Sequence, residues 1–285
     1  MQQLKVSHLT EYTFADYVTL EPHRLLLRPR EDHDIRILTS RLDITPAHKI
    51  RWHRDVYNNS VATVEFQEAA AVLSIFSEIT LEHYDDAPLD FLVADYAVMY
   101  PFEYKSWEEA DLSPYLQPNY PADQAILHDW LQRSGMVQGP LQTYVLLDRL
   151  SKWIAQHLNY RMREEPGVQS PGNTLNSGSG SCRDYAALYL ELCRLLGLAC
   201  RFVSGYLHVP ATESGHGSTH AWVEVYLPGP GWKGFDPTSG ELTAGQHIPV
   251  AVARHPEWVP PISGSFIGSA QTPTLTVKVR VTPVD

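Results

Sequence analysis

Cysteine is scarce in this chain of 285 residues, which contains only Cys182, Cys193 and Cys200. An odd count of so few cysteines argues against a disulfide framework and favours a reducing compartment. The first residues, Met1–His8, lack the apolar run of a signal peptide. No later stretch approaches the roughly 18 uninterrupted apolar residues that a membrane helix requires. The sequence therefore predicts a soluble, cytoplasmic protein.

Basic residues are also few, because 22 Lys and Arg face 33 Asp and Glu and leave a net charge of −11. A chain this acidic repels phosphate groups, so we expect neither nucleic acid nor an anionic membrane as a partner. Hydrophobic residues make up 44% of the chain. That content is enough to bury a sizeable core, and it excludes an intrinsically disordered protein.

Signature motifs for metals and phosphates are missing as well. The sequence has no Cys-x-x-Cys, no His-Glu-x-x-His, no calcium loop of alternating aspartates and no phosphate-loop lysine. We therefore predict that the protein uses no metal and no other cofactor.

The first hundred residues alternate between apolar and polar side chains with the period of a β-strand. The clearest case is Leu73–Leu81, where five alternate positions share one face. Short runs of this kind, interrupted by turn residues at 45–46 and 57–60, are typical of an antiparallel sandwich or barrel. Since no catalytic cluster occurs here, we expect a packing or recognition module.

Three prolines between Ser113 and Asp123 predict a linker, so we divide the chain into domains 1–115 and 116–285. In the second part the apolar spacing becomes helical. A segment rich in glycine, serine and asparagine, 170–180, is expected to lack regular structure. Alternating patterns then predict strands at 201–209, 219–227, 232–236 and 275–281. Together these patterns predict an α+β fold in which an antiparallel β-sandwich is followed by a domain of helices and antiparallel strands.

Cys182 is placed like a nucleophile. Ser181 and Asp184 have the spacing of a capping box, which puts Cys182 at the first position of a helix. There the free backbone N–H groups and the helix dipole stabilise a thiolate, and an exposed N–H can bind an oxyanion. Cys193 falls on the apolar face of the same helix and Cys200 begins a strand, so we expect both to be core thiols.

His220 and Asp236 are the candidates for a base and for the group that orients it. They lie 16 residues apart on two predicted strands joined by a turn at 228–231, a spacing that allows direct cross-strand pairing. A core histidine and a turn aspartate before Pro237 explain the same spacing equally well. The spacing alone leaves both interpretations open.

Four sequence blocks of the second part, taken in their order along the chain, form a recognisable pattern: Gly178–Leu188, Gly197–Tyr206, Thr219–Leu227 and Gly231–Thr238. Together they resemble the bacterial transglutaminase-like superfamily. Two strings in the first part, Glu11–Phe14 and Glu21–Arg30, are similar to the β-rich region that precedes this core in many members. The resemblance implies a papain-like transglutaminase core with a catalytic triad at Cys182, His220 and Asp236.

The resemblance also implies an enzyme. Cys182 would attack a peptide or carboxamide carbonyl to form a thioester, so the expected partner is a peptide or protein substrate. Attack on the thioester by water makes a peptidase or amidase, and attack by an amine makes an acyltransferase. We favour hydrolysis because water is always present and no amine-binding feature is evident. A non-catalytic scaffold that only binds a peptide is the remaining alternative, and an intact triad counts against it.

A second oxyanion donor, beside the backbone N–H of Cys182, is sought among the amide side chains that precede the nucleophile. Gln169, Asn173 and Asn176 lie in this segment. Gln169 is preferred because its longer side chain can reach inward from a loop. Asn176 has the offset of the glutamine in papain-like proteases, and Tyr160 is the next candidate.

Overall fold

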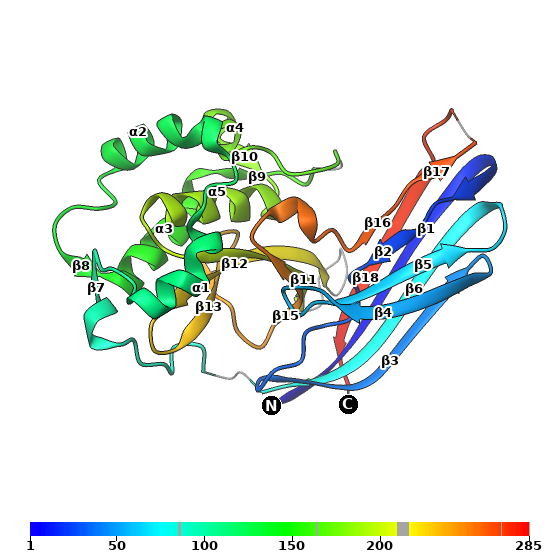
Figure 1. Ribbon diagram of the computed structural model, residues 1–285, viewed down its shortest axis with the longest axis horizontal. Coiled ribbons are helices and arrows are strands. Elements are labelled where there is room, and N and C mark those ends of the chain that lie inside the picture. Colours follow the sequence, from blue (N-terminus) through cyan, green and yellow to red (C-terminus); the bar gives the residue numbers. More distant parts are fainter. Residues whose placement is uncertain (85–86, 164, 210–216, 269, 285) are drawn as a thin grey trace.

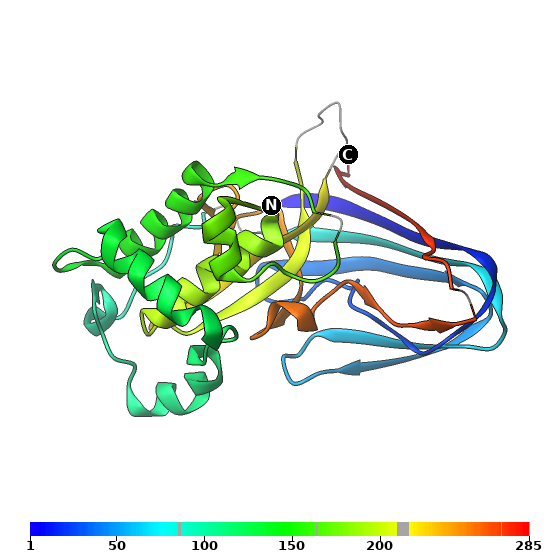
Figure 2. The same ribbon diagram turned by 90° about the horizontal axis from the view of Figure 1, so that it is seen from above.

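The computed structural model describes residues 1–84, 87–163, 165–209, 217–268 and 270–284. Its helices gather on one side of the molecule and its longest strands on the other, as Figures 1 and 2 show from two directions. The molecule thus has one side made of strands and another made of helices and strands, and the predicted α+β fold is confirmed.

Two antiparallel sheets form the N-terminal part of the molecule. In the first, the strand order is β17-β1-β6-β3 and β18 also pairs with β1; in the second, it is β16-β2-β5-β4. Their N-terminal strands are β1 (Gln2–Leu20), β2 (His23–Leu25), β3 (Ile35–Thr45), β4 (His48–Arg54), β5 (Ser60–Phe66) and β6 (Ala70–His83). Buried side chains from both sheets, such as Leu25, Val64 and Leu73, pack into one cluster. The predicted N-terminal antiparallel sandwich is therefore present.

The alternation predicted for residues 73–81 is realised in β6. Leu73, Ile75, Ser77, Ile79 and Leu81 are all buried, while the side chains between them are more exposed. Their regular spacing places one face of the strand in the core, because successive side chains of a strand point to opposite faces.

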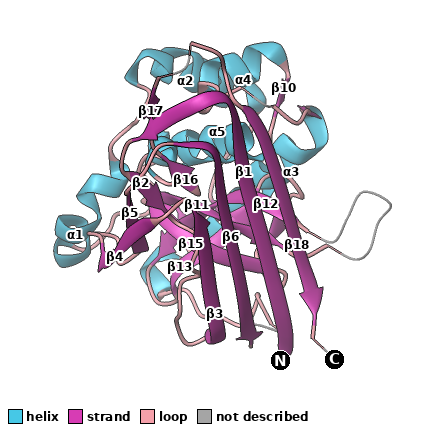
Figure 3. Cartoon of the chain, turned by 90° about the vertical axis from the view of Figure 1, so that its right-hand side faces the viewer, coloured by secondary structure: helices cyan, strands magenta, loops and turns pink. Residues whose placement is uncertain are grey.

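The end of the chain returns to the N-terminal sheets. Strand β16 (Ile262–Ser263) pairs with β2, whereas β17 (Phe266–Ile267) and β18 (Thr274–Pro283) pair with β1. Figure 3 shows β18 lying beside β1 along most of its length. The division into domains 1–115 and 116–285 remains a prediction, and the sheets of the first part take their last strands from the second.

A third antiparallel sheet, with order β14-β13-β12-β11-β15, supports the helical side. Its strands are β11 (Cys200–Leu207), β12 (Ser218–Leu227), β13 (Gly231–Asp236), β14 (Glu241–Leu242) and β15 (His247–Ala253). Two short ladders are also described: β7 (Met99–Tyr100) with β8 (Leu141–Gln142), and β9 (Asn159–Tyr160) with β10 (Ser179–Gly180).

The described residues form five α-helices: α1 (Ser106–Leu116), α2 (Gln124–Ser134), α3 (Thr143–His157), α4 (Pro171–Ser177) and α5 (Cys182–Leu195). Of these, α1, α3 and α5 contact the third sheet. Three 3₁₀ turns lie at η1 (Asp95–Ala97), η2 (Pro121–Asp123) and η3 (Pro256–Trp258). Helix α5 is the most buried, and it packs on β11 and β12. Among the described residues, no helix has the length and apolar character needed to cross a membrane.

One hydrophobic cluster continues from the helices into the N-terminal sheets. It contains Leu188 of α5 and Val223 of β12 together with Leu4, Ile79 and Leu81 of the sandwich. The two parts therefore share a hydrophobic core, in which the sandwich packs against the third sheet.

Two segments that were predicted to be irregular are partly helical, which corrects those predictions. Helix α1 includes Pro114, although the proline-rich segment was expected to be a linker. Helix α4 lies within the segment that was expected to lack regular structure. It forms because Ser170 caps it by accepting the N–H of Asn173, Pro171 occupies its first turn and Gly178 ends it with φ of +63°.

Candidate active site

The first turn of α5 presents Cys182 at the start of a helix, as predicted. Ser181 is the N-cap, and its backbone N–H and Oγ both contact Oδ2 of Asp184, at 2.8 and 2.9 Å. Cys182 is half-buried, whereas Cys193 and Cys200 are fully buried free thiols. Burial raises the pKa of Cys193 well above its usual value, and it raises the pKa of Cys200 to about 12. Of the three cysteines, Cys182 alone combines access to solvent with a helix N-terminus.

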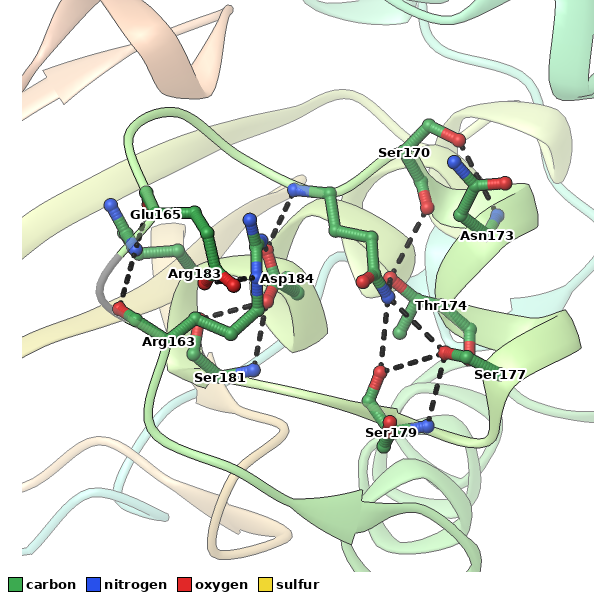
Figure 4. Close-up of polar contacts among 11 residues, drawn as sticks. Arg163, Glu165, Ser170, Asn173, Thr174, Ser177, Ser179, Ser181, Arg183 and Asp184 are labelled. Carbon is green, nitrogen blue, oxygen red and sulfur yellow. Dashed lines mark hydrogen bonds and ion pairs between the residues drawn. The ribbon is translucent and has the colours of Figure 1, made fainter.

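Asp184 binds Arg163 and Gln169, which flank residues that line the same cavity as Cys182. Its Oδ1 accepts Nη1 of Arg163 at 2.8 Å and the backbone N–H of Gln169 at 2.7 Å. Arg183 donates to the carbonyls of Arg163 and Glu165 at 3.2 and 3.3 Å. Figure 4 shows these side chains drawn together around the first turn of α5. Because Asp184 is fully buried, the contacts join these residues and the nucleophile helix into one unit.

His220 of β12 and Asp236 of β13 lie side by side. His220 Nε2 is 2.8 Å from Asp236 Oδ2, and both side chains are buried. The strand register pairs Val223 with Phe235, so Asp236 is opposite Trp222 and diagonal to His220. Direct cross-strand pairing was therefore wrong by two residues, but diagonal neighbours on one face of a sheet are still within reach.

The pKa values of His220 and Asp236 are shifted in opposite directions. Burial alone would lower the pKa of His220, but hydrogen bonds to Asp236 and Cys182, together with their negative charges, raise that pKa to about 10. Burial would raise the pKa of Asp236, but hydrogen bonds from His220 and His247 hold it well below its usual value. Since Nε2 of His220 faces Asp236, the other ring nitrogen is left for Cys182. The arrangement therefore favours the protonated form of His220.

Tyr160 is a further polar side chain beside Cys182. The ladder of β9 and β10 pairs Tyr160 with Gly180, two residues before the nucleophile. The Tyr160 hydroxyl is hydrogen-bonded to both the backbone N–H and the side chain of Cys182, and burial together with the nearby thiol raises the pKa of Tyr160 to about 12. Its ring packs edge-on against Tyr185 at 6.1 Å. This hydroxyl is thus close to where an oxyanion would bind.

The amide side chains suggested as oxyanion donors lie elsewhere. Gln169 Nε2 donates to Thr174 Oγ1 and to the carbonyl of Ser179, each at 3.0 Å. Asn176 is exposed on α4, and neither Gln169 nor Asn176 lines the cavity that contains Cys182. The structure therefore speaks against both residues as donors, because the polar groups of the short helix α4 occupy Gln169.

Cys182 and His220 open into a cavity of about 880 Å³. Its walls come from the segment after β9, from β11, from the residues around η3, and from Val277 of β18. Apolar side chains such as Met162, Val168 and Val259 make up much of the lining, with Arg163, Arg183 and Glu257 as charged groups. A cavity of this size and character suits part of a peptide.

One group of side chains in the described part of the chain could also hold a metal ion. The ligand-type atoms of His220, Asp236 and His247 lie within 4.8 Å of one another. However, Nε2 of each histidine already contacts the carboxylate, at 2.8 and 3.2 Å. We interpret the group as a hydrogen-bond network. His247 was not identified as a site residue from the sequence.

Comparison with protein families and known proteins gives consistent results. A family model described as the transglutaminase-like superfamily matches residues 133–237, which include Cys182, His220 and Asp236. A second, described as the bacterial transglutaminase-like N-terminal region, matches residues 4–82.

Individual known proteins are similar to this chain over different shares of its length. An uncharacterized protein of Mycobacterium tuberculosis is 29% identical over 99% of this chain and 93% of its own length. The human kyphoscoliosis peptidase is 33% identical over 31% of this chain and 14% of its own length. The crystal structure of a candidate cysteine protease from Cytophaga hutchinsonii has a TM-score of 0.73 and 18% identity, and it covers 100% of this chain and 91% of that one. That likeness extends over both the sandwich and the helical side.

Proposed function

This chain belongs to the transglutaminase-like superfamily, and we propose that it is a cysteine-dependent enzyme acting on peptide or carboxamide bonds through a thioester at Cys182. One observation carries the proposal: the buried His220 is hydrogen-bonded to Asp236, its pKa is raised by Asp236 and Cys182, and it lines the same cavity as Cys182. A nucleophile, a base and an orienting group in this order are what acyl transfer requires.

The first half of the reaction forms the thioester. The thiol of Cys182 gives its proton to His220, and the sulfur attacks the carbonyl carbon, so that a C–S bond forms and the carbonyl electrons move to oxygen. The tetrahedral intermediate then collapses, the C–N bond breaks, and the leaving amine takes the proton from the imidazolium. Asp236 holds His220 in the tautomer and orientation that both proton transfers need.

The developing oxyanion requires donors at the same place. The backbone N–H of Cys182 is one, because it begins a helix and has no partner in the preceding turn. The Tyr160 hydroxyl is the second in our proposal, since it already contacts this N–H and this thiol. On substrate binding, the hydroxyl turns its proton towards the oxyanion.

Hydrolysis is the proposed outcome of the second half. Water gives a proton to His220 and attacks the thioester, which releases a carboxylic acid and restores the thiol. The name of the human relative, a peptidase, supports this preference. Transfer of the acyl group to an amine uses the same residues, and a scaffold that only binds a peptide is the non-catalytic alternative.

A peptide library analysed by mass spectrometry, with and without an added primary amine, distinguishes these outcomes. We expect chain cleavage or conversion of carboxamides to acids, with no amine adduct. An adduct that depends on Cys182 would make the protein an acyltransferase. A library left unchanged by the wild type and by Cys182→Ala alike would favour the scaffold.

We further propose a cytoplasmic location and a peptide or protein as the sole class of partner, with no nucleic acid and no membrane. The support is the net charge of −11 and the presence of three free thiols, because acidic surfaces repel phosphates and free thiols persist where the medium is reducing.

A further inference from the structure

His247 gives Asp236 a second imidazole contact. Its Nε2 lies 3.2 Å from Oδ2 of Asp236, the same oxygen that His220 contacts. Nδ1 of His247 accepts the backbone N–H of Ala244 at 3.3 Å, so a neutral His247 carries its proton on Nε2 and donates it to Asp236. The other carboxylate oxygen accepts the N–H of Thr238 at 2.9 Å. Asp236 thus receives three hydrogen bonds, two of them from imidazoles.

The burial of Asp236 makes each of these donors important. Its side chain is only 1% exposed, so water cannot replace a missing partner. With His247 and Thr238 in place, both carboxylate oxygens are fixed, and Oδ2 lies within hydrogen-bond distance of His220. Without His247, one oxygen keeps a single donor and the carboxylate is free to rotate away from its position.

His247 is itself held through both its backbone and its ring. Its backbone N–H donates to the carbonyl of Ala244 at 2.8 Å, and its own carbonyl accepts Nε2 of His83 at 3.1 Å. Trp222 packs edge-on against the ring with centroids 5.2 Å apart. His247 is 3% exposed. A ring fixed in this way can fix the carboxylate beside it.

The N-terminal sandwich supplies part of this support. His83 is the last residue of β6, and Arg30 donates its backbone N–H to the carbonyl of Pro249 at 2.8 Å. Asn59 pairs with both backbone groups of Val252, each at 2.8 Å. All three contacts fall on β15, the strand that begins at His247. The sandwich is therefore linked to Asp236 indirectly, because it contacts β15 and the first residue of β15, His247, contacts the Asp236 carboxylate.

We propose that His247 is a positioning residue that holds the Asp236 carboxylate against His220, and that the N-terminal sandwich supports the active site through β15. This proposal rests on the proposed function. It also gives the sandwich, which contains no catalytic residue of its own, a part in the reaction.

Two amide variants of His247 form a matched pair for the test. The side-chain nitrogen of His247→Gln reaches the place of Nε2 and can donate to Asp236. The shorter His247→Asn can replace Nδ1 towards Ala244 but cannot reach Asp236. His8→Asn controls for the loss of a buried imidazole elsewhere, because His8 contacts Tyr206 and Thr10 at 2.9 and 3.0 Å, outside the active site.

The measurement is the rate of Cys182 alkylation by iodoacetamide as a function of pH, read by peptide mass spectrometry. Loss of a hydrogen bond to a charged group should slow alkylation of His247→Asn at about pH 6 by about 10- to 100-fold and move the acid limb of its profile to higher pH. We expect His247→Gln to recover most of the rate and His8→Asn to follow the wild type. A purely structural role would lower the melting temperature without moving the acid limb.

Other titratable groups near His247 do not affect the comparison between His247→Asn and His247→Gln. His220, Asp236, His83 and Cys182 are the titratable groups already described. The other titratable residues near His247 line a cavity together with it: His33, Asp34, Tyr84, Asp90, Glu224 and Lys233. They are identical in all variants, so a difference between His247→Asn and His247→Gln reports on position 247.

The outcomes separate this proposal from the proposed function. If Cys182 of the wild type shows no preferential alkylation at acidic pH, the proposed function fails. If it does, but His247→Asn follows the wild-type profile, the role of His247 alone is overturned. Nitrogen NMR of the histidine rings provides a test that needs no folded variant: we expect neutral His247 to be protonated at Nε2, and a proton on Nδ1 instead would overturn the proposal.

Discussion

Replacing Asp236 by asparagine probes the orientation of His220 with almost no change in shape. Asp236 accepts hydrogen bonds from His220, His247 and the backbone of Thr238, whereas an asparagine has one accepting oxygen and one donating NH₂. If the NH₂ faces the imidazoles, His220 must move its proton to the nitrogen that faces Cys182. If it faces Thr238, two donors meet. Either arrangement removes a contact that the wild type makes.

The expected loss follows from the first of these arrangements. A proton on the nitrogen facing Cys182 prevents His220 from accepting the thiol proton, and the corresponding change in a serine protease lowers kcat by about 10⁴-fold. We therefore expect Asp236→Asn to slow acylation by p-nitrophenyl acetate by about 10³- to 10⁴-fold. The cost in folding should be about 1–3 kcal/mol, because one buried polar group loses its partner.

The assay is the release of p-nitrophenol under single-turnover conditions, with thermal unfolding followed in parallel. Asp123→Asn is the matched control, because Asp123 accepts the backbone N–H of Gly172 at 2.8 Å and does not line the cavity with Cys182. The control should acylate at close to the wild-type rate. A folded Asp236→Asn protein that keeps more than about a tenth of the wild-type rate would refute the role of Asp236 in orienting His220.

Four further outcomes are expected. Iodoacetamide at about pH 6 should label Cys182 well before the two buried cysteines, whose thiols hold their protons, as peptide mapping would show; equal labelling would contradict the site. Tyr160→Phe should slow acylation by about 100-fold or more through loss of an oxyanion donor, while Gln169→Ala keeps most of the rate. Peptide turnover should fall above about pH 10, where His220 loses the proton that the leaving amine needs, and EDTA should leave the turnover rate unchanged.

Features encoded over a few residues could be predicted from the sequence. The capping box of Ser181 and Asp184 places Cys182 at the start of α5 because its hydrogen bonds join residues three apart. Alternation in β6 likewise identifies a strand with one buried face. By contrast, α4 was missed because its composition suggests a loop, although Ser170 and Gly178 carry the cap signals of a short helix.

Features that depend on the packing of distant segments could not be predicted in this way. The register of β12 and β13 is set by the turn between them, so counting from its centre displaced Asp236 by two residues. His247 gave no signal, because its contact with Asp236 depends on where β15 lies in the sheet. Gln169 was chosen for its reach, but the partners that occupy it belong to the unpredicted helix α4.

The central claim is that Cys182 forms an acyl-enzyme, and mapping of that intermediate tests it most directly. The protein is mixed with p-nitrophenyl acetate, quenched in acid before deacylation and digested, and the acetyl group is located by tandem mass spectrometry. We predict one acetyl group on Cys182 and none at this position in Asp236→Asn quenched at the same time. Acetylation spread over lysines and other cysteines, with Cys182 unmodified, would contradict the account.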